Sequence, residues 1–298
     1  MSTPAPARDQ SAAPLIYSNP EFSRQFDSRP FEFEHNLSSH PLFELPRLLK
    51  LARSTEAVRP GDLYYDAGEI RVDQRWDETG PKMITVEQAI DNIECTGAWI
   101  VLKRVERDPE YAELLRQCMQ DAQHYIGRDL TKDLRVAQDG IIFISSPNRV
   151  TSYHIDRECS FLLQIQGEKS ISVFDRDDRV VLTEQELERF WTVDNNAPRY
   201  KPDAQGRASV FALRPGNGVH IPVNCPHWLK NGNNLSISFN INCQFKDRFR
   251  ANLYRANFAL RTLRLSPAPP GKSRFRDVLK RRLVGPAVSG AMRLRNAL

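Results

Sequence analysis

Short apolar runs with alternating polar positions recur along the chain after residue 97, a pattern typical of β-strands. We expect strands at residues 98–102, 141–145, 161–165, 171–174, 209–213, 219–223 and 235–243. Seven or more short strands bury their apolar faces most readily by closing on one another. The pattern therefore predicts a mainly β fold in the form of a barrel.

Helical spacing and capping residues predict helices beside these strands. The longest begins at Asp108, is followed by a Pro at its first position, and carries an apolar stripe as far as Ile126. A Thr with Gln or Glu three residues later forms the capping-box pattern, which predicts helices from Thr85 and over residues 183–191. A Leu-rich stretch predicts a further helix over 41–52. We expect these helices to flank the barrel.

Composition divides the chain into three parts. Residues 1–14 are rich in Ala, Pro and Ser, which predicts a disordered N-terminus. Residues 15–265 are expected to form one domain, because 298 residues with 40% hydrophobic content can bury a large core. Within it, the polar segment 194–207 is expected to be a loop near the barrel mouth. A Pro-rich linker then opens the segment 266–298, a basic tail expected to be helical.

Targeting and cysteine patterns favour a cytoplasmic protein. The sequence has no run of 18 apolar residues, so no membrane span is expected, and no signal-peptide pattern is found at its start. Its five cysteines are odd in number and lack Cys-x-x-Cys spacing, which argues against a disulfide scaffold or a zinc ribbon. A reducing compartment fits this pattern.

His154, Asp156 and the distant His227 are the strongest candidates for a metal site. Side chains two apart on an extended strand share a face, so His154 and Asp156 can reach one ion. His227 follows a turn, a short apolar strand and a Pro-containing corner, as expected of a ligand brought back by a neighbouring strand. Two imidazoles and one carboxylate leave three octahedral positions open, which favours Fe(II), a chelating cosubstrate and dioxygen over structural zinc.

The segment 151–174 reads as a strand, a tight turn at Gln166-Gly167-Glu168 and a second strand. With Pro215-Gly-Asn-Gly-Val-His-Ile-Pro222 and Ile237-Ser-Phe-Asn240, it resembles the jumonji C, or cupin-like, 2-oxoglutarate dioxygenases. Within that family it most resembles the asparaginyl hydroxylase that inhibits hypoxia-inducible factor. The likeness covers residues 140–245 and, more loosely, 31–51. It implies a double-stranded β-helix, the cupin or jelly-roll barrel, with flanking N-terminal and C-terminal helices.

The resemblance also implies roles for individual residues. The family's His-x-Asp motif and remote His bind iron, which assigns His154, Asp156 and His227 as ligands. Its Lys fifteen residues after the first His pairs with the far carboxylate of 2-oxoglutarate, and Lys169 has this spacing. Its Thr three residues before the first His matches Thr151. The alternatives are a solvated lysine at a hairpin edge and an ordinary strand threonine.

Two further cosubstrate contacts and three departures follow from the same comparison of residues. Asn240 matches the family's Asn on the strand after the last His, although Asn is also ordinary near strand ends. Ser160 stands where the family has Asn six residues after the first His, which changes a cosubstrate contact. Asn217 replaces the usual Asp, and Cys225-Pro226 replaces an aromatic pair before His227. These departures concern the substrate and the cosubstrate more than the metal.

The remaining histidines have less specific surroundings. His220 lies seven residues before His227 and is the alternative distal ligand, but the family pattern makes it a strand residue. His35, His40 and His124 have no carboxylate at ligand spacing, so we expect them to be surface or packing residues.

Basic residues concentrate at the C-terminal end. Residues 271–298 contain eight Lys or Arg and one Asp, a net charge of +7, so the rest of the chain carries −2 of the overall +5. Phe275, Val278, Leu279 and Leu283 give a partial helical stripe. Such a tail suits an acidic partner, nucleic acid or a membrane surface. A solvated tail or a helix paired in a homodimer is equally compatible, and the lack of a groove-reading motif weighs against nucleic acid.

Together these features predict an Fe(II)- and 2-oxoglutarate-dependent oxygenase that hydroxylates a peptide, a protein or a small molecule. A first alternative is a non-catalytic metal-binding cupin that acts as a sensor or regulator, associated with nucleic acid through the tail. The presence of Lys169 argues against it, since a sensor need not keep a cosubstrate anchor. A second alternative is another metal-dependent cupin reaction, such as an isomerisation or a dioxygenation without cosubstrate.

Overall fold

Antiparallel strands and the helices beside them form the first of two compact units. In the computed structural model, the described residues are 13–75, 85–127, 129–130, 132–245 and 249–283. The first unit comprises Met1–Asp175 and Arg207–Phe245, and the second comprises Arg176–Gly206 and Lys246–Leu298. Most of the predicted disordered N-terminus, residues 1–12, lies outside the described residues.

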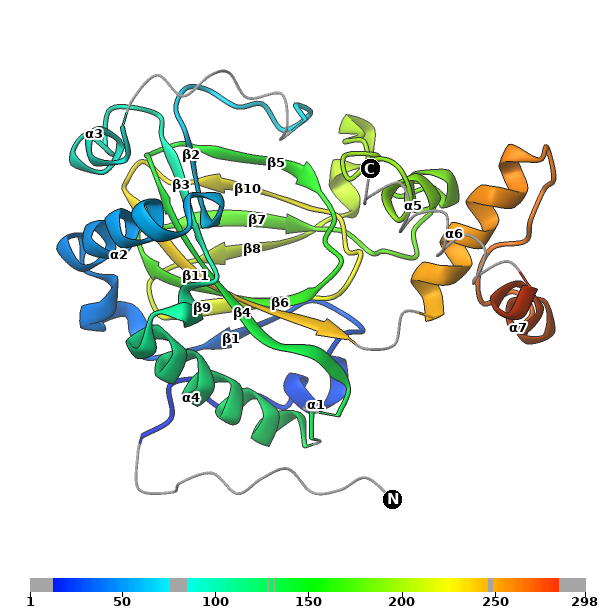
Figure 1. Cartoon of the computed structure of the whole chain (residues 1–298), viewed down its shortest axis with the longest axis horizontal. Helices are drawn as coiled ribbons and strands as arrows, with labels where there is room; N and C mark the ends of the chain where they lie inside the picture. Colours follow the sequence, from blue (N-terminus) through cyan, green and yellow to red (C-terminus); the bar gives the residue numbers. More distant parts are fainter. Residues whose placement is uncertain (1–12, 76–84, 128, 131, 246–248, 284–298) are drawn as a thin grey trace. The chain divides into compact units, whose positions relative to one another are not determined.

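The first unit contains two sheets (Figure 1). The seven-stranded sheet has the order β1 Phe31–Glu34, β9 Asn217–Ile221, β6 Cys159–Gln166, β11 Ser236–Phe245, β4 Leu134–Ser145, β3 Trp99–Lys103 and β2 Leu63–Asp66. The four-stranded sheet has the order β5 Val150–His154, β10 His227–Asn231, β7 Lys169–Val173 and β8 Ser209–Leu213. All strand pairs in both sheets are antiparallel.

From β4 onward the chain passes repeatedly between the two sheets. β4, β6, β9 and β11 lie in the larger sheet, whereas β5, β7, β8 and β10 lie in the smaller one. Apolar side chains from both sheets meet in one buried cluster that includes Leu162 and Val219 on one side and Ile171 and Leu229 on the other. We call this space between the sheets the barrel interior. The arrangement confirms the predicted mainly β fold and is consistent with a cupin or jelly-roll fold.

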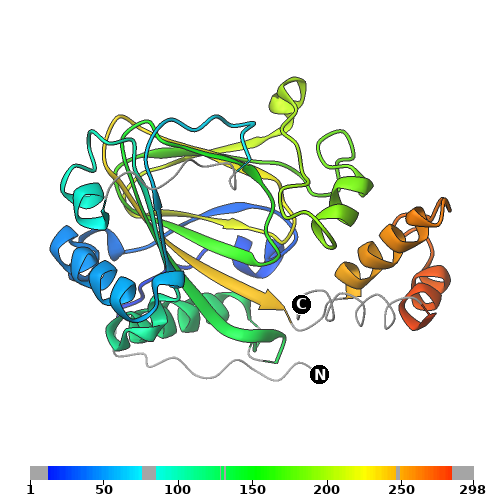
Figure 2. The same cartoon turned by 45° about the horizontal axis from the view of Figure 1, so that its top comes forward.

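The opposite face of the larger sheet carries the main hydrophobic core. Residues of β4, β6 and β11 on this face form one buried cluster with Leu48 and Leu51 of α2 and with Tyr111 and Leu115 of α4. The helices of this unit are α1 Glu21–Gln25, α2 Leu45–Val58, α3 Val86–Asp91 and α4 Pro109–Ile126, with 3₁₀ turns η1 Leu37–Ser39, η2 Pro41–Phe43, η3 Pro60–Asp62 and η4 Val105–Arg107. Both views show α4 lying along the larger sheet (Figures 1 and 2).

The predicted helix starts are confirmed. Asp108 accepts a hydrogen bond from the backbone N–H of Glu110 at the start of α4, and Gly127 ends that helix in the left-handed conformation. Thr85 and Thr183 each form the expected capping box. The helix predicted over 41–52 is instead a 3₁₀ turn followed by α2, because Glu44 is extended and the Pro after Leu45 cannot donate a backbone hydrogen bond.

All seven predicted strands overlap observed ones, but four observed strands fall outside those ranges. These are β1, β2, β5 and β10, although β5 overlaps the segment from Thr151 that the sequence pattern predicts as a strand. The predicted strand, turn and strand around Gly167 is present, yet it is not a paired hairpin, because β6 and β7 belong to different sheets. Gly167 has φ of 72°, and a Cβ there would clash with the carbonyl of Leu235. The turn therefore carries the chain from one sheet to the other.

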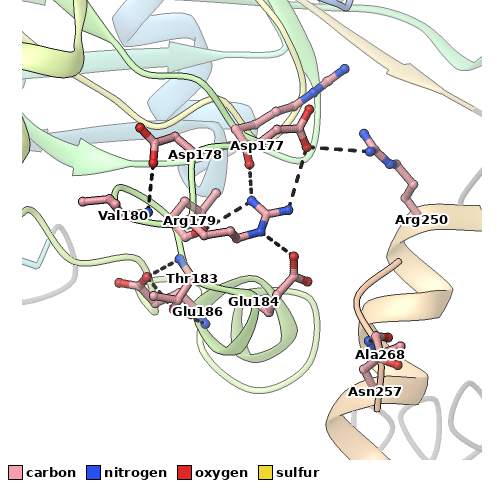
Figure 3. A network of polar contacts seen from close by, with 12 residues as sticks. Asp177, Asp178, Arg179, Val180, Thr183, Glu184, Glu186, Arg250, Asn257 and Ala268 are labelled. Atoms are coloured by element: carbon pink, nitrogen blue, oxygen red, sulfur yellow. Dashed lines mark hydrogen bonds and ion pairs between the residues drawn. The ribbon is translucent and has the colours of Figure 1, made fainter. Parts of the chain in front are cut away.

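The second unit is helical. It contains α5 Glu184–Phe190, all but the last residue of η5 Pro202–Arg207, α6 Phe249–Thr262 and α7 Arg274–Leu283. η5 lies in the segment 194–207, which was predicted to be a loop. Ion pairs join α6 to the 176–206 segment, as Figure 3 shows for Arg250 and Asp177, whose charged atoms are 3.8 Å apart. Arg261 pairs with the buried Glu188 at 2.7 Å. No helix among the described residues is long and apolar enough to cross a membrane.

Candidate metal and cosubstrate site

Two adjacent strands of the smaller sheet bring His154 and His227 together. β5 and β10 pair so that these two residues lie opposite each other, with ring centroids 4.2 Å apart. His154 is the last residue of β5, and His227 is the first residue of β10. The long sequence separation is bridged by strand pairing, as the sequence predicts.

Asp156 completes the cluster from a loop. The prediction that His154 and Asp156 share one strand is wrong in detail, because β5 ends at His154. The Asp156 carbonyl accepts a hydrogen bond from the backbone N–H of Asn224, which links this loop to the corner before His227. Asn224 has φ of 62°, a left-handed conformation that Asn tolerates better than most residues. A hydrogen bond between two loops, and not alternation along a strand, therefore positions Asp156 beside the two histidines.

The donor atoms of the three residues face one another. His227 Nε2 and His154 Nε2 are 3.5 and 3.9 Å from Asp156 Oδ2, and the three possible ligand atoms all lie within 4.8 Å of one another. Ligand atoms about 2.1 Å from one ion and at right angles would lie about 3 Å apart. A small rearrangement of side chains would therefore let one ion contact all three.

Hydrogen bonds leave the inward nitrogen of each imidazole available. Nδ1 of His154 lies 2.7 Å from the Ser152 carbonyl, and Nδ1 of His227 lies 2.9 Å from the Cys225 carbonyl. A carbonyl only accepts, so each Nδ1 carries a proton, and in the neutral tautomer that a metal ligand needs, the lone pair is on Nε2. Burial and the neighbouring His154 imidazole lower the pKa of His227 to about 4, so its ring is neutral at pH 7. Both residues suit metal ligation.

Lys169 lies in the barrel interior at the far end of β7. It shares a strand face with the buried Ile171 and Val173, and Val173 is opposite His227 whereas Lys169 is opposite Asn231. The side chain is 7% exposed, and no hydrogen bond or ion pair joins it to another residue within the described parts of the chain. Burial lowers its pKa to about 7. The side chain is thus a buried amine, not the solvated hairpin lysine of the alternative.

The distance between Lys169 and the histidine pair can be compared with the length of a small diacid. Val173 lies four positions after Lys169, roughly 13 Å along the strand. An extended lysine side chain covers about half of this length. A five-carbon diacid could therefore reach from the amine to the histidine cluster.

Thr151 faces the interior because of a bulge. Thr151 is opposite Leu229, and His154 is opposite His227, so three residues of β5 match two residues of β10. Opposite residues in an antiparallel pair share a face, and Leu229 belongs to the interior cluster. Without the bulge, residues three apart would point to opposite faces. The bulge thus puts Thr151 and His154 on the same side.

Asn240 and Ser160 also face the interior, but from the larger sheet. Asn240 is opposite Leu162 and Ser160 is opposite Ile221, and both of these partners belong to the interior cluster. Asn240 Nδ2 donates to Asn242 Oδ1 at 2.8 Å. All seven predicted site residues therefore lie at the histidine cluster or on a strand face that lines the interior.

The other histidines have structural contacts. His220 is fully buried beside Phe26, Phe31 and Phe161, and its Nε2 accepts a hydrogen bond from the Asp27 backbone N–H at 3.0 Å. Its Nδ1 lies 3.0 Å from the Ser160 carbonyl, so both nitrogens are engaged. This excludes it from the cluster that contains His227. His35 and His40 accept backbone hydrogen bonds near the N-terminus, and His124 is exposed on α4.

Three interior residues were not singled out from the sequence. Glu158 is partly buried, and burial and the nearby Asp156 raise the pKa of its carboxyl group, which accepts a hydrogen bond from Gln244 at 2.7 Å. On β3 and β4, Trp99 stacks on Phe143 with ring centroids 5.9 Å apart, and both rings are half-buried. Phe143 is opposite Ser238 on the interior face of β11. Alternation along β4 could have indicated Phe143, but the position of Trp99 depends on strand pairing.

Comparisons with known proteins identify the fold. No protein-family model matches the sequence, and no curated protein is significantly similar to it. The solved structure of Escherichia coli ycfD has 15% sequence identity and a TM-score of 0.52, covering 90% of this chain and 67% of that chain. Another structure, described as the Escherichia coli ribosomal oxygenase YcfD with cobalt and 2-oxoglutarate, has 15% identity and a TM-score of 0.47, covering 88% and 64%.

The present chain thus spans about two thirds of the length of those structures. The likeness to ycfD shows a shared fold of mainly antiparallel sheets with several helices.

Proposed function

We propose that this protein is an Fe(II)- and 2-oxoglutarate-dependent dioxygenase of the jumonji C, or cupin-like, type, built on a double-stranded β-helix. One observation carries the proposal: the Nε2 atoms of His154 and His227 converge with Asp156 Oδ2 near one end of β7, and the buried Lys169 lies at the other end. The resemblance to the asparaginyl hydroxylase that inhibits hypoxia-inducible factor stays a prediction.

The donor set favours iron. Two imidazoles and one carboxylate suit a redox-active metal with open coordination positions, whereas structural zinc is usually held by four protein ligands. Asp156 is 41% exposed in its side chain, so the metal position is accessible to solvent and to ligands. When bound, ferrous iron with 2-oxoglutarate would supply the activation of dioxygen that oxidises a C–H bond.

The interior residues would hold and orient the cosubstrate. Lys169 would pair with the far carboxylate of 2-oxoglutarate, and an anion there would keep the amine protonated despite its low pKa. Thr151 would donate its hydroxyl to the same carboxylate, while Asn240 and Ser160 would contact the cosubstrate from the larger sheet. The apolar side chains around Lys169 exclude water, which strengthens this ion pair.

The substrate would be a peptide or protein side chain, or a small molecule, and the reaction a hydroxylation. Because ycfD, whose structure shares this fold, is described as a ribosomal oxygenase, ribosomal proteins are the first substrates to test. We place the activity in the cytoplasm, where a reducing environment would keep iron ferrous and the five free cysteines reduced. Whether the protein forms a homodimer stays a prediction.

Anaerobic titration tests the proposal. Fe(II)-loaded protein should develop a visible charge-transfer band as 2-oxoglutarate is added. Lys169→Ala should weaken 2-oxoglutarate binding roughly 10- to 100-fold, because a charge-assisted hydrogen bond is lost. Lys230→Ala is the matched control, since Lys230 is exposed on the adjacent strand β10 and should bind normally. Asp156→Ala should abolish both the metal content and the band.

Admission of oxygen separates enzyme from sensor. The wild-type protein should then convert 2-oxoglutarate to succinate, whereas a metal-binding sensor would bind iron without consuming the 2-oxo acid. Iron binding with no charge-transfer band in the wild-type protein would reject the oxygenase proposal in favour of that alternative.

A further inference from the structure

The helix α7 has its apolar and polar faces reversed. In a surface helix, apolar residues normally face the protein and charged residues face water. In α7, Phe275 is 76% exposed, Leu279 is 46% exposed and Val278 is 38% exposed, whereas Asp277 is only 4% exposed. At 100° per residue, Asp277 lies nearly opposite Phe275 around the helix. The stripe formed by Phe275, Val278 and Leu279, which we call the α7 stripe, therefore faces outward.

The inward face of α7 is occupied by polar contacts. Asp277 Oδ2 accepts a hydrogen bond from the Gly271 backbone N–H at 2.8 Å, and Lys280 Nζ donates to the Ala268 carbonyl at 2.6 Å. These contacts bind the helix to the Pro-rich linker before it. These two polar contacts on the inward face help to fix the orientation of α7.

Arginines flank the α7 stripe. Arg274 and Arg276 lie about 100° to either side of Phe275, and Arg282 follows two turns later in line with it. All three are exposed, and none of their guanidinium groups forms an ion pair or hydrogen bond with another residue in the described parts of the chain. The segment Arg274–Leu283 carries five basic residues and one acidic residue. An apolar strip between positive edges therefore faces outward.

We propose that the α7 stripe docks on a membrane surface that contains anionic phospholipid. Phe275, Val278 and Leu279 enter the boundary between headgroups and acyl chains, and the flanking arginines contact lipid phosphates. Such a membrane supplies an apolar layer for the stripe and negative charge for the flanking arginines. A short helix with one apolar stripe gives reversible attachment rather than insertion across the bilayer.

Charge argues against two other occupants. A second copy of this chain docked through the same stripe would bring like-charged arginines together around a two-fold axis, which is unfavourable. Nucleic acid would use the arginines but would leave Phe275 and its apolar neighbours without partners. The lipid surface is the occupant that satisfies both parts of the helix.

Vesicle sedimentation with the full-length protein tests the proposal. The protein should sediment with vesicles of 70% phosphatidylcholine and 30% phosphatidylglycerol, and remain in solution with pure phosphatidylcholine. The double variant Phe275→Ser and Leu279→Ser should bind at least tenfold more weakly, because buried apolar area is lost. The double variant Arg274→Gln and Arg276→Gln should lose roughly fivefold per arginine, and added salt should reduce this difference.

Matched controls distinguish binding through the α7 stripe from non-specific adsorption to vesicles. Val58→Ser changes a valine that is 70% exposed at the end of α2, and Lys50→Gln with Arg24→Gln removes two exposed positive charges from the other unit. Both controls should bind vesicles as the wild type does. Their circular dichroism and thermal unfolding should match those of the α7 variants, since all these positions are exposed.

Three results would overturn the proposal. The first is no sedimentation with anionic vesicles at low salt. The second is undiminished sedimentation of the Phe275→Ser and Leu279→Ser variant, which would show that the protein binds the vesicles through its positive charge alone. The third is a dimer, seen by light scattering, that this variant converts to monomer while vesicle binding stays unchanged. That result would assign the stripe to a second copy of the chain.

Discussion

The two faces of strand β11 differ in chemistry although both are buried. Ile237, Phe239 and Ile241 point to the hydrophobic core beneath α2 and α4, and each is fully buried. The residues between them, Ser238 and Asn240, point to the barrel interior and are 0% and 8% exposed. Alternating polar residues usually mark a solvent-facing side of a sheet. Here the alternation separates a face that stabilises the fold from a face that lines the candidate site.

In the part of the chain that the structure describes, buried polar residues of the larger sheet are hydrogen-bonded to one another, whereas Lys169 on the smaller sheet is not. Ser238 Oγ donates to Gln164 Oε1 at 2.7 Å, and Gln164 Nε2 donates to Ser236 Oγ at 3.0 Å. Lys169, on the smaller sheet, has no such partner among the described residues. Satisfied polar groups make a rigid wall, whereas a buried cation without a partner destabilises the protein until an anion binds.

Substitution of adjacent β11 residues should produce the largest contrast between the two faces. Phe239→Ala should lower the free energy of unfolding by about 3–5 kcal/mol, because it opens a cavity in the core. Asn240→Ala removes one hydrogen bond and should cost about 0.5–1.5 kcal/mol. Urea denaturation measures both values. Similar costs for the two variants would contradict the separation of the faces. Asn240→Ala should in addition weaken 2-oxoglutarate binding.

Replacement of Lys169 should make the unliganded protein more stable. The pKa of Lys169 is about 7 in the folded chain against 10.5 for an ordinary lysine. Between these pH values the unfolded chain holds the proton that the folded chain has released, so this group makes stability rise with pH. Below pH 7 the full penalty applies, about 5 kcal/mol as an upper estimate from 3.5 pKa units at 1.36 kcal/mol each. Lys169→Met removes that penalty.

The pH profile of the stability difference is the decisive measurement. Urea denaturation of wild type and Lys169→Met should show the variant more stable at pH 6 to 7, with the difference fading towards pH 10.5. Lys230→Met, at an exposed position of β10, is the control and should show no such profile. A destabilised Lys169→Met protein at pH 7 would mean that the amine has a stabilising partner in the free protein.

Local signals predicted the elements better than their assembly. Asp108, Thr85 and Thr183 identified helix starts because a cap and its partner lie within three residues. β1 and β2 were not predicted, because each has only four residues and lies at a sheet edge. The division of β6 and β7 between two sheets depends on partners far along the chain, which a turn signal at Gly167 does not reveal. Distant pairing is therefore the missing information.

The same distinction between local signals and distant pairing applies to the residues of the candidate site. The spacing of His154, Asp156 and Lys169 predicted a consistent set of roles, and the structure brings the three candidate metal ligands close together. The loop position of Asp156 was not predictable from alternation, because a hydrogen bond to Asn224 supports it. The positions of Trp99 and Glu158 near the interior depend on strand pairing and burial, which no local sequence signal reveals. Sequence spacing thus identifies residues that act as a set, but not those placed beside them by the fold.

The smallest expected effect concerns Thr151, whose interior position depends on the β5 bulge. Thr151→Val keeps the branched shape and removes the hydroxyl, so 2-oxoglutarate binding should weaken about two- to tenfold while stability stays nearly constant. Ser170→Ala is the control, because Ser170 alternates with Lys169 and so points away from the interior. If the Thr151 hydroxyl and the Lys169 amine bind the same carboxylate, the double variant Thr151→Val and Lys169→Ala should lose less than the product of the two single losses. Independent losses would place Thr151 outside the cosubstrate site, and the bulge would then serve only to position His154.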